Sequence, residues 1–200
     1  MLARLRAAPL TLSLFTATGK TAAADILTQL YLEDAAEVSA RRVGVFTVFG
    51  FWYLGGFQYW LYVRCFARWF PSAARFGEHA TLRARWNDTA GLVDLAKQCA
   101  AGNFLHIPFI FLPSFYLTQE LTSHGLQDAS PRAALDACRR NWWSDCCAAW
   151  AIWLPGHAVF FSVPLWLRLP VNHAMSFCYV CVLSAMRGAG GGRAEKQISR

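Results

Sequence analysis

Asp25 and Gln29 are polar residues four positions apart in an otherwise apolar stretch near the start of the chain. Residues at i and i+4 of a helix lie on one face, so both side chains should point the same way. An acid within a membrane helix is by default a candidate functional group. The pair either lines a pore, with Lys20 one turn earlier setting its ion preference, or forms a polar clasp to another helix. We favour the clasp, with Lys20, Arg168 or a backbone donor as the expected partner of Asp25, because other polar residues suited to a pore lining are lacking.

Other sequence patterns that could indicate nucleotide binding, metal binding or catalysis are incomplete. The stretch 19–21 (GKT) resembles the end of a phosphate-binding loop, but that loop needs a glycine at position 14, which is Leu14. Cys178 and Cys181 have CxxC spacing, but no second cysteine or histidine pair completes a four-ligand zinc site. The motifs of serine hydrolases and zinc proteases are absent from the sequence as well. We therefore expect no catalytic residue, no cofactor-binding residue and no metal ligand, and we expect that the protein is not an enzyme.

Three histidines, His106, His157 and His173, lie within apolar runs. A proton relay would need acids beside them, and the predicted spans that contain them have none. We therefore interpret each histidine as a neutral side chain whose ring is satisfied by a neighbouring carbonyl group.

The composition indicates an integral membrane protein. Of 200 residues, 56% are hydrophobic, 15% are aromatic and only 16% are charged, whereas a soluble domain carries about 25% charged residues. This balance excludes a disordered chain and disfavours a soluble enzyme. The seven cysteines are an odd number and do not form the framework of a secreted disulfide-bonded protein.

Long apolar runs predict the fold class, because about 20 apolar residues cross a bilayer as a helix. We predict an all-α membrane bundle in a single domain, 1–200, with four principal spans and one further C-terminal run as a candidate fifth. The runs are 9–32, 43–63, 98–119, 146–167 and 169–186. The first run carries small residues on one face, Ala17, Thr21 and Ala24, and such a face lets two membrane helices approach closely.

The net charge of +7 comes mainly from arginines spread through the connectors between the apolar runs. They form no basic stripe interleaved with aromatic residues, so we expect no nucleic acid as a partner. Membrane topology and anionic lipid head groups, with cardiolipin as one candidate, explain the charge better.

The distribution of basic residues predicts the topology. With four spans, one side of the membrane holds eleven of them: Arg4, Arg6, Arg64, Arg68, Arg75, Arg83, Arg85, Arg187, Arg193, Lys196 and Arg200. The other side holds five: Arg41, Arg42, Arg132, Arg139 and Arg140. This asymmetry places both termini on the matrix or cytosolic side. If 169–186 is a true fifth span, the C-terminal tail moves across and the count becomes seven to nine.

Several positions together resemble a known family. They are Asp25, Gln29, Gly56, Pro71, Phe160, Val163, Pro164, Arg168, Tyr179, Leu183 and Ser184. The stretch 163–168 (VPLWLR), preceded by Phe160 and followed by Tyr179, resembles the ending of the Mpv-seventeen / PMP-twenty-two family. The resemblance implies a membrane bundle in the mitochondrial inner membrane or, alternatively, the peroxisomal membrane, and a small-solute pore. The first fifteen residues, with two arginines and no acid, favour mitochondria.

The chain departs from that family at polar positions. A proline and a histidine of the second-helix motif are here Phe57 and Trp60, and a glutamine and an asparagine before the VP pair are here Gly156 and Val159. These replacements and the nine tryptophans favour a non-catalytic accessory subunit of a larger membrane complex, with other membrane subunits as partners. The small-solute pore is the alternative.

Overall fold

The computed structural model describes residues 9–33 and 35–187, and the regular structure in these residues is helical. The first half holds α2 (Pro9–Leu27), the π-helical η1 (Thr28–Leu32), α3 (Ala40–Phe49), η2 (Gly50–Phe57), η3 (Trp60–Cys65) and α4 (Phe66–Trp69). The second half holds α5 (Pro71–Glu78), α6 (Leu82–Asn87), α7 (Thr89–Ala100), η4 (Ala101–Phe111), α8 (Leu112–Asp128), α9 (Pro131–Ser162) and α10 (Leu165–Arg187).

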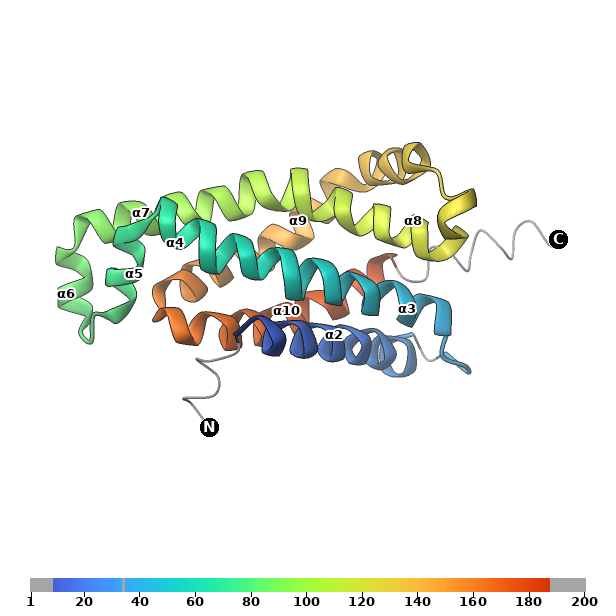
Figure 1. Ribbon diagram of the computed structural model, residues 1–200, viewed down its shortest axis with the longest axis horizontal. Helices are drawn as coiled ribbons and strands as arrows, with labels where there is room; N and C mark the ends of the chain where they lie inside the picture. The colour runs from blue at the N-terminus through green and yellow to red at the C-terminus, as the bar shows by residue number, and fades with distance from the viewer. Residues whose placement is uncertain (1–8, 34, 188–200) are drawn as a thin grey trace.

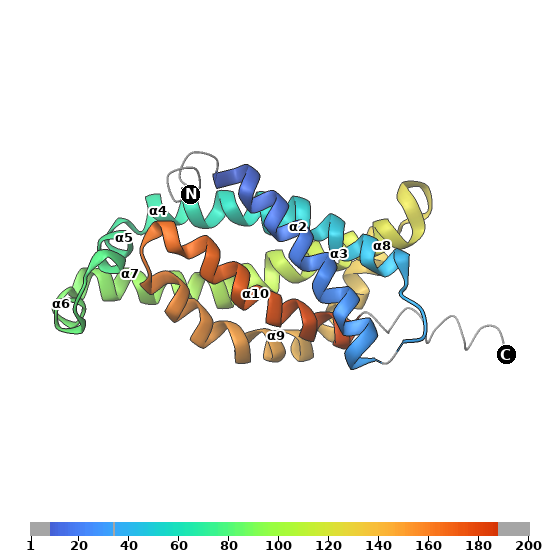
Figure 2. The ribbon, with the colours of Figure 1, turned by 90° about the horizontal axis from the view of Figure 1, so that it is seen from below.

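These elements join into long helical stretches that lie side by side along one axis (Figures 1 and 2). α2 packs against α3, η2 and α10, while α9 packs against α7, η4, α8 and α10. The short helices α5 and α6 form one end of the molecule (Figure 1). α2 and α10 run in the same direction, so α2 starts toward the α5–α6 end and α10 finishes at the opposite end (Figure 2).

The all-helical prediction is confirmed for the described residues, but the count of four spans is not. Of the described helices, one continuous stretch, Thr89–Gly125, is long and apolar enough by itself to be a candidate membrane span. Pro170–Met186 is a shorter apolar helix. The other predicted spans are rich in Gly, Ala, Thr, Trp and Tyr, which contribute much less hydrophobicity than Leu or Ile.

The C-terminal part differs from the prediction in two ways. The predicted run 146–167 is interrupted, because α9 ends at Ser162 and α10 begins at Leu165 after Val163 and Pro164. Pro164 has no N–H to continue the ladder of α9, and its ring keeps the preceding residue extended. The run 169–186 belongs to α10, a helix of 23 residues.

The described part of the chain runs along the bundle axis an odd number of times. The described residues contain five long helical stretches, which begin at α2, α3, α7, α9 and α10. The eleven-to-five count of basic residues assumed an even number of spans. Five of the basic residues in that count, Arg4, Arg6, Arg193, Lys196 and Arg200, lie outside the described residues.

Small residues explain why α2 and η2 lie close together. Ala17, Thr21 and Ala24 are fully buried, as the small-residue face predicts. A Cβ atom added to Gly50 would lie 3.0 Å from the Ala17 carbonyl oxygen, and one added to Gly55 would lie 2.7 Å from the Leu14 Cα atom. Larger side chains at these two positions would push the helices apart, so glycine is required by the spacing of the helices.

The short helices α5 to α7 are held together by Asp88. Its carboxylate caps α7 by accepting from the Gly91 N–H at 3.0 Å, and it also accepts from Arg75 Nη2 at 2.8 Å. His79 Nε2 lies 3.0 Å from the second oxygen. The hydrogen bond from Arg75 is the main reason why the pKa of Asp88 lies well below its usual range.

This arrangement predicts that acid loosens the α5–α7 end first. A carboxyl group whose pKa is lowered on folding stabilises the folded state above its ordinary pKa of 3.8, and this contribution is lost as the pH falls toward the folded value. The protection of the amides in residues 71–91, measured against their intrinsic exchange rates, should therefore fall below about pH 4, and in Asp88→Asn it should be low already at neutral pH. Asp136→Asn, at an exposed acid on α9, should leave this protection unchanged. Equal acid sensitivity in native protein and Asp88→Asn would contradict the assignment.

Candidate functional site

Asp25 lies in the last turns of α2 and is fully buried. Three donors surround its carboxylate. Arg42 Nε donates to Oδ1 at 2.8 Å, the Ser184 hydroxyl donates to the same oxygen at 2.6 Å, and Gln29 Nε2 donates to Oδ2 at 2.8 Å. A buried charge is tolerated when it is paired and hydrogen-bonded in this way.

Arg42 comes from the first turn of α3, after the loop that follows η1. Its Nη1 and Nη2 atoms donate to both carboxylate oxygens of Glu33, at 2.6 and 2.9 Å. Nη2 also donates to the Ser184 hydroxyl at 2.7 Å. The planar fork of a guanidinium group suits such paired contacts, which a lysine could not make.

The hydrogen bonds and ion pairs of Asp25 and Arg42 join three helices at the same end of the bundle. We call Asp25, Glu33, Arg42 and Ser184 the clasp. Asp25 belongs to α2, Arg42 to α3 and Ser184 to α10. Gln29 supports it, because its Oε1 accepts from the Ser39 N–H at 2.7 Å and so fixes the loop before α3.

The partner of Asp25 differs from the expected ones. Lys20 donates instead to the Ser176 hydroxyl of α10, and Arg168 lies in another part of the fold. From the sequence, Arg42 is expected only to be one of the connector charges. The signal that could have found it is that Arg41 and Arg42 are the first basic residues after Asp25, directly behind a short connector.

Arg168 is buried, although none of the described acids forms an ion pair with it. Its Nη2 donates to the carbonyl oxygens of Phe161 at 3.0 Å and Ala73 at 3.2 Å, and its guanidinium lies over the Phe161 ring. Phe161 is in the last turn of α9, whose carbonyl groups carry partial negative charge. Arg168 therefore caps α9 and fastens α5 to it.

The other residues of the family resemblance have structural positions. Phe160, Tyr179, Leu183 and Ser184 are buried between α9 and α10 and their neighbours. Val163 and Pro164 form the turn between these helices, and the Val163 carbonyl lies directly against Gly77 of α5. Pro71 is the first residue of α5, and Gly56 lies within η2 beside Leu14.

A cavity lies in the centre of the bundle. It is lined by Gln58, Tyr62, His106, Ile107, Phe111, Trp153 and His157. His106 lies between two tyrosines, with the Tyr53 hydroxyl 2.8 Å from Nε2 and the Tyr62 hydroxyl 3.0 Å from Nδ1. The prediction that a carbonyl group satisfies this histidine is therefore wrong, because the aromatic interior supplies hydroxyl groups instead.

Several buried polar atoms on the helical stretches that form this cavity have no hydrogen-bond partner within the described part of the chain. They are His157 Nδ1, Gln58 Oε1, Asn103 Oδ1 and both side-chain polar atoms of Gln98. Gln98, Asn103 and His106 follow one another along α7 and η4. We call these residues, together with Gln58 and His157, the polar column. The sequence places His106 and His157 in apolar runs, but no local pattern indicates that they meet Gln58, Gln98 and Asn103 in the folded chain.

None of the described His, Cys, Asp and Glu residues assemble into a group of three or more suited to a metal ion. Cys178 is exposed and Cys181 is partly buried on α10. The clasp and the polar column are the two sets of buried polar side chains that we consider as candidate functional sites.

The clasp predicts a specific order of stability losses. Arg42→Gln leaves Asp25 and Glu33 without their cation, and removing one partner of a buried ion pair costs about 3–5 kcal/mol. Asp25→Asn, which keeps Arg42 paired with Glu33, should cost less. The measurement is thermal unfolding of the purified full chain in detergent, followed by tryptophan fluorescence.

Arg41→Gln is the matched control, because it removes the same charge from an exposed neighbouring side chain. It should change the free energy of unfolding by no more than about 0.5 kcal/mol. Equal effects of Arg41→Gln and Arg42→Gln would show that the clasp does not stabilise the bundle.

Comparisons of the chain with models of known families, with curated proteins and with solved structures found no match. The family resemblance stays a prediction drawn from the residues themselves.

Proposed function

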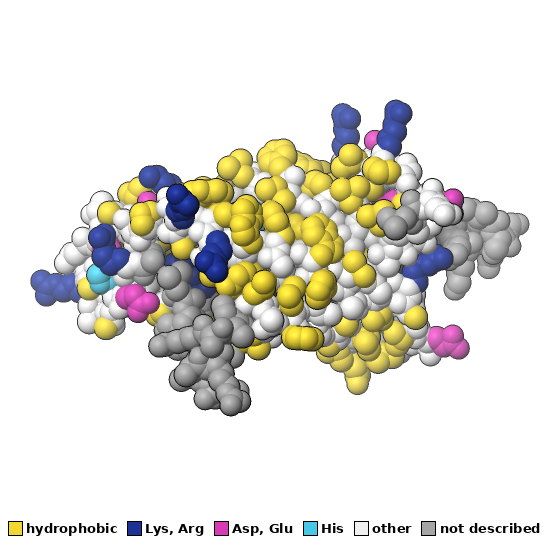
Figure 3. Space-filling view, in the orientation of Figure 1, with side chains coloured by type: hydrophobic (Ala, Val, Ile, Leu, Met, Phe, Trp, Pro, Cys, Tyr) yellow, Lys and Arg dark blue, Asp and Glu magenta, His cyan; other side chains and the backbone are white. Residues whose placement is uncertain are grey.

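We propose that the chain is a non-catalytic integral protein of the mitochondrial inner membrane and an accessory, structural subunit of a larger membrane complex. The observation that carries the proposal is the apolar outer surface of the bundle. Large hydrophobic side chains are exposed along its middle: Phe15, Val48, Phe51, Trp52, Trp60, Phe104, Leu105, Phe109, Ile110, Leu154, Val159 and Val182. Figure 3 shows such side chains over the middle of one face, with exposed charged side chains toward the two ends.

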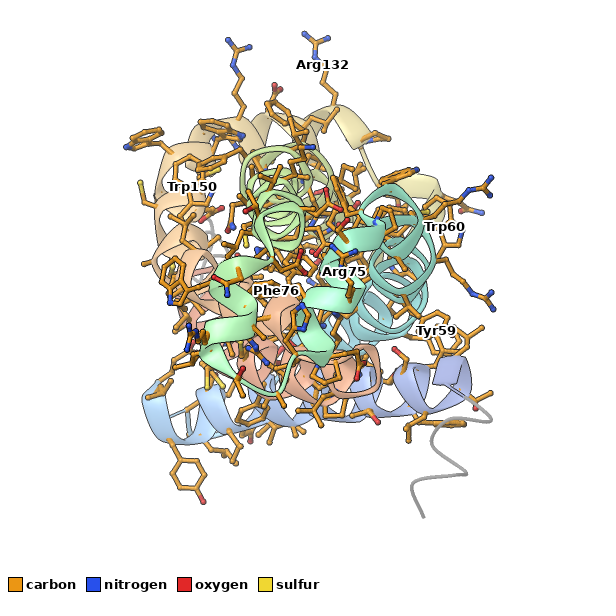
Figure 4. All side chains as sticks on the ribbon, turned by 90° about the vertical axis from the view of Figure 1, so that its left-hand side faces the viewer. Tyr59, Trp60, Arg75, Phe76, Arg132 and Trp150 are labelled. Atoms are coloured by element: carbon orange, nitrogen blue, oxygen red, sulfur yellow. The ribbon has the colours of Figure 1, made fainter. Side chains whose placement is uncertain are left out.

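A soluble monomer rarely exposes an apolar patch of this extent. Phe15, Leu105 and Phe109 are 80%, 61% and 66% exposed, so lipid tails or a partner's apolar helices are the surroundings that suit them. Figure 4, which looks along the bundle from the α5–α6 end, shows Trp60 and Arg132 on its periphery and Phe76 inside. We interpret the five long helical stretches as membrane spans, with α10 as the fifth.

An accessory role is supported by the filled interior. Aromatic side chains occupy the centre of the bundle, where the Phe49 ring lies 4.9 Å from Tyr53 and 5.4 Å from both Phe111 and Phe115. The central cavity has room for about one water molecule. The outer surface is therefore the part of the molecule available for interactions. The arginine-rich N-terminal sequence supports mitochondria over peroxisomes.

A small-solute pore of the Mpv-seventeen / PMP-twenty-two type is the second candidate, and the polar column favours it. Pore interiors need polar groups that face one another. Gln58, Gln98, Asn103, His106 and His157 bring such groups into the bundle from three of the long helical stretches.

The first test is the size of the native assembly. The accessory role predicts that, in mild detergent, most of the full chain migrates in blue-native gels with a complex much larger than the 22.4 kDa monomer. Migration only as a monomer or a small homo-oligomer would contradict it. The pore predicts solute flux through the purified chain in liposomes, and a flux altered by Asp25→Asn with unchanged protein level would favour the pore.

The second test is topology. Because an odd number of helical stretches places the start of α2 and the end of α10 at opposite ends of the bundle, epitope tags at the two termini should lie on opposite sides of the membrane. Protease treatment of mitoplasts and of intact mitochondria, each with antibodies to one tag, measures this. Two tags protected on the same side would contradict the five-span arrangement and would support four spans.

A further inference from the structure

The central cavity has a polar wall and an apolar wall. Ile107, Phe111 and Trp153 form the apolar part, and Gln58, Tyr62, His106 and His157 form the polar part. The polar residues belong to three helical stretches: Gln58 and Tyr62 to the η2–η3 stretch, His106 to η4, and His157 to α9. The cavity therefore lies where these stretches meet.

Two of the polar groups are already satisfied. The Tyr53 and Tyr62 hydroxyls lie 2.8 and 3.0 Å from the two ring nitrogens of His106. A neutral imidazole has one donor and one acceptor, so one tyrosine accepts from His106 and the other donates to it. His106 and Tyr62 thus fix the wall of the cavity without needing an occupant.

The other two polar groups are not satisfied by the described residues. Gln58 is 5% exposed and its Oε1 atom has no donor, while His157 is 1% exposed and its Nδ1 atom has no partner. Leaving one buried polar atom without a hydrogen bond costs about 1–3 kcal/mol. Both residues line the same cavity, and a single occupant hydrogen-bonded to both atoms would satisfy them.

The size and chemistry of the cavity select the occupant. The space admits about one water molecule. Its lining contains neither a carboxylate nor a lysine or arginine, so an ion would lose its hydration without gaining a counter-charge. An apolar occupant would leave Gln58 and His157 unsatisfied. A small neutral molecule with two hydrogen atoms to donate suits both acceptors.

We propose that the cavity is a binding site for one buried water molecule, which donates hydrogen bonds to Gln58 Oε1 and His157 Nδ1. In this arrangement His157 is the neutral tautomer with its proton on Nε2. The water joins the η2–η3 stretch to α9 beside the His106 cluster, so it contributes to the packing of the bundle centre. The proposal is independent of whether the chain is an accessory subunit or a pore.

The test is nitrogen NMR of the full chain in lipid nanodiscs with its histidine rings labelled with ¹⁵N. Nδ1 of His157 should show the shift of a hydrogen-bonded acceptor, and a water-edited spectrum of the unsubstituted protein should give a cross-peak from a retained water. Gln58→Met keeps the length of the side chain but removes the acceptor, so the His157 shift should move toward that of a free acceptor.

Gln98→Met is the matched control. Gln98 is also buried with both polar atoms unpartnered, but it does not line the cavity. This substitution should leave the His157 signal unchanged. A free Nδ1 and no water cross-peak in the unsubstituted protein, or the same His157 shift in Gln58→Met and Gln98→Met, would overturn the proposal.

Ammonia is about as small as water and can also donate two hydrogen bonds to these acceptors, and a titration separates the two. Ammonium chloride and sodium chloride are compared at equal ionic strength and constant neutral pH. If the site holds water, the His157 Nδ1 shift stays the same in both salts. A saturable shift in the ammonium series alone would assign the site to ammonia and overturn the assignment to water. The unsubstituted spectrum supplies a result even if Gln58→Met fails to fold.

Discussion

The burial of Asp25 is the constraint on which the arrangement of α2, α3 and α10 depends. A carboxylate without water needs a cation and several donors, and here they come from Arg42 and Ser184 of two other helices. Arg42 can supply them only if α3 begins directly opposite the last turns of α2. Glu33, in the loop between these helices, uses the rest of the guanidinium. The geometry of one ion pair therefore fixes where three helices meet.

A second buried cation fastens the opposite end by different means. Arg168 has carbonyl oxygens and an aromatic ring around it, where Arg42 has carboxylates. The end of α9 supplies partial charges through its unpaired carbonyl groups. Because the guanidinium also bonds to Ala73, α5 is held against the turn at Val163 and Pro164. The two arginines hold the bundle at its two ends, and aromatic packing fills the length between them.

The helical architecture could be predicted from the sequence because it follows from long apolar runs and from the need to satisfy the backbone within each helix. The pairing of Asp25 could not, because the choice among Lys20, Arg42 and Arg168 depends on how the helices are aligned, which local patterns do not encode. The same holds for His106, whose tyrosine partners lie 53 and 44 positions away. Pro164 could have indicated the break between the two helices, but the apolar residues on both sides of it favour one continuous run in the sequence.

The surface of the described bundle carries many exposed apolar side chains, and its interior holds several polar ones. Large apolar side chains such as Phe15, Leu105 and Phe109 are exposed, while Gln58, Gln98 and His157 lie inside among aromatic rings, with polar atoms that have no partner among the described residues. Unsatisfied polar atoms are costly in a low-dielectric interior, so they favour any state that hydrates them. Opening the polar column would, however, require the His106–Tyr53–Tyr62 contacts to separate, together with the stacked rings around them. The proposed pore would therefore require the aromatic cluster that closes the interior to rearrange, whereas the proposed accessory role would use the apolar surface as it stands.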